Sequence, residues 1–173
     1  MPDPATLAQA VRDAVPFFTR FLVGFDGSNH TAQAPGLANH AAWTLGHLAL
    51  YLHRGAEAFD RRALPASDFI EGAQDGDAER FATESVAFGS VPVAEPGRYP
   101  AWPRCEATFH SAADRFVHSI LESSADQLAG DVRWGNGEVS GAALVTRQIF
   151  HIATHTGQVI DLRRALKMPL VVG

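Results

Sequence analysis

Apolar residues recur every three or four positions in four long stretches of the chain, the spacing that places them on one face of an α-helix. These stretches cover about residues 5–25, 37–62, 102–123 and 140–167. The alternating pattern typical of strands is nearly absent. Four amphipathic segments of about twenty residues each predict an all-α fold, and specifically a four-helix bundle.

Turn-forming and capping residues mark the ends of these segments. Pro16 lies inside the first one, so a kink or a late start is expected there. Asn39 is a possible N-cap of the second helix and Ser140 of the fourth, which Pro169 stops. The turn signal from Trp134 to Gly137 is expected to join two short extended pieces.

Between residues 63 and 100 the periodicity weakens, and prolines and glycines are frequent. One short helical candidate lies near residues 77–88. A connection of this length is uncommon inside a compact domain. It is expected to wrap the outside of a bundle or to cover one end of it. Two interpretations stay open: a crossover between the second and third helices required by the topology, or a lid over an active site.

Length and composition set broad limits. A chain of 173 residues suits one domain, residues 1–173, that can bury its own core. The net charge of −5 weighs against a nucleic-acid partner. No apolar run approaches the roughly 20 residues that a membrane span needs, and the N-terminus lacks the pattern of a signal peptide. Because Cys105 is the only cysteine, no intrachain disulfide can form, and a cytoplasmic location is expected.

The most informative residues are two histidines four positions apart, His151 and His155, in the fourth predicted helix. At about 100° of rotation per residue they lie one turn apart on one face, as two ligands of a single metal ion would. His47, in the second predicted helix, is the candidate third ligand. Three histidines from two helices would leave a coordination position open for water or substrate, as in catalytic zinc sites.

Hydrogen-bonded histidines are the alternative interpretation. An unpaired buried imidazole costs roughly 1–3 kcal/mol, and one ion would satisfy both rings of the pair. Residues 152–154 contain no acid, so the metalloprotease pattern with its built-in glutamate base is absent. Gly157 follows the pair. A mid-helix glycine costs about 1 kcal/mol relative to alanine, so a close approach to the backbone is expected there.

Three further residues are candidates for substrate binding. Tyr51 and Arg54 fall on the same side of the second helix as His47 and could hold an anionic substrate group, although packing and surface roles are the alternative. Gln158 could support a metal ligand, contact substrate, or be an exposed amide. His40 is expected at the end of the helix, because it is too far from His47 along the axis to share its ion.

The order of these elements resembles the DinB/YfiT-like superfamily. The resemblance rests on three segments: WTLGHL at 43–48, HIATHTGQ at 151–158, and LRRAL at 162–166 followed by Pro169. It implies a four-helix bundle with up-down-down-up topology. It also implies a divalent metal ion held by one histidine of the second helix and two of the last, which in this chain are His47, His151 and His155.

The resemblance implies a class of reactions rather than one reaction. Members include transferases and isomerases that use low-molecular-weight thiols such as mycothiol, bacillithiol or glutathione, and members commonly form homodimers. The expected function is therefore that of a metalloenzyme acting on a small electrophile, with hydrolysis as the next subclass. Zinc is favoured, but nickel, cobalt, copper or iron also suits imidazole ligands. The alternative is a non-catalytic, dimeric, stress-related protein that binds a metal or another ligand.

Overall fold

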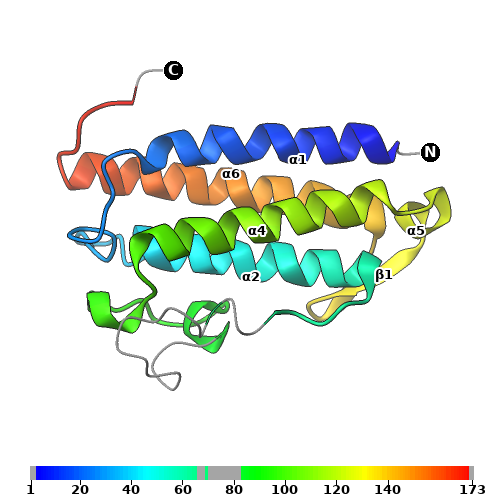
Figure 1. Cartoon of the computed structure of the whole chain (residues 1–173), viewed down its shortest axis with the longest axis horizontal. Helices are drawn as coiled ribbons and strands as arrows, with labels where there is room; N and C mark the ends of the chain where they lie inside the picture. Colours follow the sequence, from blue (N-terminus) through cyan, green and yellow to red (C-terminus); the bar gives the residue numbers. More distant parts are fainter. Residues whose placement is uncertain (1–2, 66–68, 70–82, 172–173) are drawn as a thin grey trace.

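The structure is a computed structural model that describes residues 3–65, 69 and 83–171. Four long helices dominate this part of the chain (Figure 1). They are α1 Pro4–Thr19, α2 Ala41–Asp60, α4 Trp102–Leu121 and α6 Gly141–Ala165. Each predicted helical segment overlaps one of them, so the expectation of an all-α fold is confirmed. None of the helices in these residues is both long and apolar enough to cross a membrane.

The helices pack through their apolar faces. In Figure 1 they lie alongside one another, and α2 packs against α4 and α6 while α1 packs against α4 and α6. The largest fully buried side chains include Phe18 of α1, Leu45 and Leu48 of α2, and Phe109 and Phe116 of α4. The contact between α2 and α6 joins the second predicted helix to the fourth, and so brings together the two helices that carry the candidate metal ligands.

A short helix and a hairpin connect α4 to α6. Helix α5, Ala125–Ala129, is followed by strands β1, Asp131–Trp134, and β2, Gly137–Ser140, which pair antiparallel with Trp134 opposite Gly137. The two-residue turn between them places Gly135 at a φ of 60°, a conformation that glycine adopts without steric cost. The prediction of two short extended pieces around this turn is therefore confirmed.

The first helix differs from its prediction. It begins at Pro4, where Asp3 caps it by accepting a hydrogen bond from the Thr6 N–H at 2.9 Å. The expected late start is therefore wrong, because this cap and a proline at the first helical position favour an early one. Pro16 lies within α1, which ends at Thr19 and continues as a 3₁₀ turn, η1, Arg20–Leu22.

The N-cap residue of α2 also differs from its prediction. His40 holds the N-cap position rather than Asn39, and its Nδ1 accepts from the Trp43 N–H at 3.1 Å. Its other ring nitrogen donates to the Val93 carbonyl at 3.1 Å, so a contact from a distant segment selects the cap. The expectation that His40 lies at the helix end is confirmed. At α6 the predicted cap holds, since the Ser140 hydroxyl accepts from the Ala143 N–H at 3.2 Å.

Part of the segment between α2 and α4 lies along α2, near Trp43, His47 and Tyr51. Most of the helical candidate at 77–88 falls outside the described residues, and its later part forms a 3₁₀ turn, η2, Thr83–Val86. A second such turn, η3, spans Pro96–Arg98. The Tyr51 hydroxyl accepts from the Phe88 N–H at 3.1 Å, and Trp43 Nε1 donates to the Ser90 hydroxyl at 2.9 Å.

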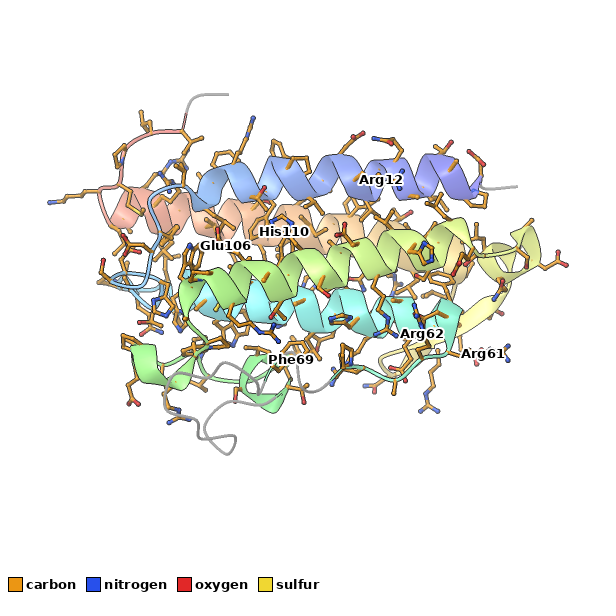
Figure 2. All side chains as sticks on the ribbon, in the orientation of Figure 1. Arg12, Arg61, Arg62, Phe69, Glu106 and His110 are labelled. Carbon is orange, nitrogen blue, oxygen red and sulfur yellow. The ribbon has the colours of Figure 1, made fainter. Side chains whose placement is uncertain are left out.

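The end of α2 is tied to α4 by an ion pair. The Asp60 carboxylate accepts two hydrogen bonds from Arg115, from Nε and Nη2, both at 3.0 Å. It also accepts from the backbone N–H and the Nε of Arg62, which lies just beyond the helix end (Figure 2). Burial opposes ionisation of Asp60, but these hydrogen bonds outweigh it and lower its pKa to about 2.

Asp60→Asn is expected to lower the free energy of unfolding at pH 7 by about 2 kcal/mol. Because the folded-state pKa lies below the ordinary value of 3.8, this stabilisation is present above that value and is lost as the pH falls toward 2. Urea unfolding at pH 7 and at pH 3 measures it. Asp161→Asn is the matched control, because the Asp161–Arg164 pair is exposed; its expected cost is under about 0.5 kcal/mol. An equal loss of unfolding free energy in the two variants would contradict a stabilising role for the Asp60–Arg115 ion pair.

Candidate metal centre

Three histidines from two helices meet where α2 packs against α6. His47 Nε2 lies 3.0 Å from His151 Nε2, which lies 3.1 Å from His155 Nε2. One ring nitrogen of each histidine is within 4.8 Å of the other two, so the three are close enough to hold one metal ion. The four-residue spacing stacks His151 and His155 on one face of α6, and the helix contact brings His47 to them.

The proton on His47 is fixed by its neighbour. His47 Nδ1 lies 2.6 Å from the Val86 carbonyl oxygen, which can only accept a hydrogen bond. In the neutral ring the proton is therefore on Nδ1, and Nε2 presents a lone pair to the other two histidines. A carbonyl on the outer nitrogen is the usual support of a metal-binding histidine, because it fixes both the tautomer and the ring orientation.

Neutral imidazoles cannot satisfy both short contacts of His151. If its Nε2 carries a proton, that proton can be donated to His47 or to His155, but not to both. If it carries none, its lone pair faces the lone pair of His47. The hydrogen-bonded alternative thus leaves one contact unmade. A cation among the three nitrogens satisfies all of them, so this donor set fits a divalent metal ion.

Burial keeps these rings uncharged near neutral pH. Burial, followed by the neighbouring His47, lowers the pKa of His151 to about 4. Burial and the two neighbouring histidines lower the pKa of His155 to about 3. The pKa of His47 is also lowered by burial, although the Val86 carbonyl opposes the shift. Neutral imidazole is the form that binds metal, so no proton has to leave at pH 7.

Packing around His47 holds its ring in place. The Trp43 indole stacks on it at 4.4 Å between ring centroids and an interplanar angle of 17°. Gly46 lets Val86 approach the helix closely, since a Cβ at Gly46 would lie 2.9 Å from Val86 Cγ1. No sequence pattern indicated a role for Val86, which lies 39 residues from His47 in the segment where the periodicity weakens.

Gly46→Ala is expected to weaken zinc binding about tenfold, because the added methyl displaces Val86 and with it the carbonyl that orients His47. Competition with a chromogenic chelator measures the affinity.

Gly157→Ala is the matched control. Beyond the helix's own backbone, no described residue lies within 4 Å of a Cβ at Gly157, so no described part of this chain makes the close approach that was expected there. This control should leave the affinity unchanged and raise the free energy of unfolding by about 1 kcal/mol. Equal loss of affinity in both variants would contradict the role of Val86.

A cavity of about 410 Å³ opens onto two of the three histidines, His47 and His151. It is lined by His47 and Tyr51 from α2, by Trp134 and Asn136 from the hairpin, by His151, Gln148 and Arg147 from α6, and by Phe88 and Gly135. Gln148 is 2% exposed, and its Oε1 has no hydrogen-bond partner among the described residues. A buried acceptor without a partner is costly, so Gln148 is suited to bind a donor group of whatever enters this cavity. Its position three residues before His151, on the inward face, was the available sequence signal.

The predicted substrate-binding residues lie in different places. Tyr51 lines the cavity beside the histidines, 4.8 Å from His47 and 5.4 Å from His151 between ring centroids. Arg54 lines an adjoining cavity, and its guanidinium carbon lies 5.4 Å from the centre of the Tyr51 ring. Gln158 lines neither: its Oε1 accepts from Asn39 Nδ2 at 3.1 Å. Gln158 also lies near His155, where it counteracts part of the effect of burial on the pKa of that ring.

Cys105 is not a nucleophile in this fold. The side chain is 4% exposed, and burial, followed by the charge of Glu106, raises the pKa of its thiol to about 12. The thiolate form required for attack is therefore absent near neutral pH. The two exposed histidines of α4, His110 and His118, also lie outside the cavity that His47 and His151 line, and His118 pairs with Glu122 at 3.1 Å.

Comparisons of the chain with protein-family models, curated proteins and solved structures found no match. The resemblance to the DinB/YfiT-like superfamily therefore stays a prediction from the sequence.

Proposed function

We propose that this protein is a metal-dependent enzyme in which His47, His151 and His155 hold one divalent ion, with zinc favoured. The observation that carries the proposal is the convergence of three uncharged Nε2 atoms whose short contacts neutral imidazoles alone cannot satisfy. An ion held by the three imidazoles, with one coordination position left open, would lower the pKa of a thiol or water bound there and so supply a nucleophile near neutral pH.

The leading subclass is a transferase or isomerase that joins a low-molecular-weight thiol, such as mycothiol, bacillithiol or glutathione, to a small electrophile. Two observations support an external thiol. The only cysteine of the chain is Cys105, which is buried and protonated. The cavity at the histidines, about 410 Å³, is of the size that small ligands occupy. In this proposal Gln148 accepts a hydrogen bond from the bound molecule, and Tyr51 and Trp134 form the walls.

The same proposal includes the fold of the DinB/YfiT-like superfamily, an up-down-down-up bundle in which the segment between α2 and α4 is the crossover. The course of the helices in Figure 1 supports it: α1 and α6 both begin at the end where the N-terminus lies, and α2 and α4 begin at the other.

A second candidate is a non-catalytic, dimeric metal- or ligand-binding protein. One observation favours a dimer: α6 exposes Phe150, which is 66% exposed, one turn and two turns before the exposed Ala153 and Gly157. Small residues beside an aromatic one would let a second copy pack closely. Light scattering after size exclusion measures the oligomeric state, and a dimer without thiol chemistry would favour this candidate over the enzyme.

Thiol consumption tests the enzyme proposal. Tag-free, zinc-loaded protein is incubated with 1-chloro-2,4-dinitrobenzene and each of the three thiols in turn, and thioether formation is followed by absorbance. Acceleration by the parent protein but not by a His151→Ala/His155→Ala variant is the expected result. Equal rates with the parent, the variant and buffer, for all three thiols and for several electrophile classes, would contradict the transferase assignment.

A further inference from the structure

A second cavity adjoins the one that opens onto the histidines. The two have the same size, about 410 Å³, and share Tyr51, Trp134 and Gly135. We call the cavity lined by His47 and His151 the metal lobe, and the cavity lined by Arg54 and Arg133 the arginine lobe. Besides the shared residues, the arginine lobe is lined by Arg54, Glu57, Ala58 and Arg133. Three of these belong to α2 and the fourth to β1, so the hairpin and the helix form opposite walls of one groove.

The arginine lobe carries net positive charge. Arg54 and Arg133 contribute two guanidinium groups and Glu57 one carboxylate. Within the described part of the chain, none of the three forms an ion pair. Two guanidiniums that line one cavity, neither in an ion pair with a described residue, are a site for an anion, because each offers paired N–H donors that match a carboxylate or a phosphate.

The spacing along α2 sets the length of the ligand. His47, Tyr51 and Arg54 lie on one side of this helix. Arg54 is seven positions after His47 in the chain. At 1.5 Å per residue the backbones of His47 and Arg54 are roughly 10 Å apart along the helix axis. Tyr51 and Trp134, whose ring centroids are 6.0 Å apart at an interplanar angle of 69°, stand between the two lobes. The middle of a ligand that spans both lobes would therefore contact aromatic rings.

We propose that the groove binds an elongated small molecule whose carboxylate end lies between Arg54 and Arg133 while its reactive end reaches the histidines. The assignment of the reactive end rests on the proposed metal-dependent function; the anion site follows from the charges of the arginine lobe. A carboxylate is favoured over a phosphate because Glu57 lies in the same lobe and repels a second negative charge. The substrate class is thus an apolar or aromatic monocarboxylate about 10 Å long.

Cobalt-loaded protein and a pair of matched thiols test this proposal. Binding of 6-mercaptohexanoate and of the uncharged 6-mercaptohexanol is followed by the cobalt–thiolate absorption band. The carboxylate thiol is expected to bind about tenfold more tightly. Arg54→Gln/Arg133→Gln should remove this preference without changing the affinity for the alcohol. Glu57→Gln should strengthen binding of the carboxylate about twofold to threefold, an effect of opposite sign. Circular dichroism checks that the variants stay folded.

Each failure has a different signature. Equal affinities of the parent protein for the two thiols, with the band intact, would overturn the anion site and leave the metal site standing. A band absent with both thiols would contradict the metal site and the spanning ligand together. Tighter binding of 6-mercaptohexyl phosphate than of the carboxylate would overturn the choice of carboxylate. The preference must also fall as sodium chloride is raised, a measurement on the parent protein that needs no variant.

Discussion

Replacing both His151 and His155 by alanine is expected to raise the dissociation constant for zinc by more than about 1,000-fold. Two of the three nitrogen ligands are lost, and one histidine on α2 cannot hold the ion alone. Chelator competition on protein without a histidine tag measures the change. The helical circular dichroism should persist, because α6 keeps its cap and its buried apolar face.

The matched control is a second pair of histidines. His110 and His118 of α4 are exposed, and neither belongs to the histidine cluster. His110→Ala/His118→Ala should therefore bind zinc as the parent does. If both double variants lost zinc equally, binding would come from scattered surface histidines. If neither did, the three histidines of the cluster would be ordinary hydrogen-bonded residues.

Arg163→Met is expected to lower the free energy of unfolding by about 3–5 kcal/mol. Arg163 is 4% exposed and donates to three backbone carbonyls: those of Phe21 at 3.0 Å, Val23, and Pro169 at 2.8 Å. These hydrogen bonds of Arg163 link the turn after α1 to the chain after α6. Methionine keeps the apolar stem but leaves these carbonyls without their donor.

Urea unfolding measures this loss, with Arg164→Met as the control. Arg164 is the next residue along the chain, and its exposed guanidinium pairs with Asp161 at 3.0 Å. Its replacement should cost under about 0.5 kcal/mol. A similar small cost for both variants would show that the carbonyl contacts of Arg163 contribute little. Both residues stand near the end of a helix, so the sequence alone indicated only a favourable charge for the helix dipole.

The helices and the hairpin could be predicted because each follows from a local pattern. Burial of one face imposes a period near 3.6 on the four long segments, and a glycine at the turn permits the hairpin. A local sequence pattern does not predict a feature that depends on a contact with a residue far away in the chain. His40 rather than Asn39 caps α2, because its ring also bonds Val93 and lies 4.5 Å from Tyr99 between centroids.

The same distinction holds at the site. The spacing of His151 and His155 indicates a pair of ligands without any knowledge of the fold, and His47 joins them because α2 packs against α6. The contact of the Val86 carbonyl could not be predicted, since it joins two residues that lie 39 positions apart in the chain and no local pattern relates them. The place of Gln158 just after the histidine pair suggests a contact with substrate, whereas its side chain turns to Asn39.

X-ray absorption spectroscopy of tag-free, zinc-loaded protein, before and after addition of 6-mercaptohexanol, tests the metal centre most directly. The expected result is about one ion per chain with three imidazole nitrogens and one exchangeable light atom, replaced by sulfur when the thiol is added. No bound zinc after incubation and dialysis would contradict the metal centre. A closed site with four protein ligands would contradict the enzyme and leave a structural ion.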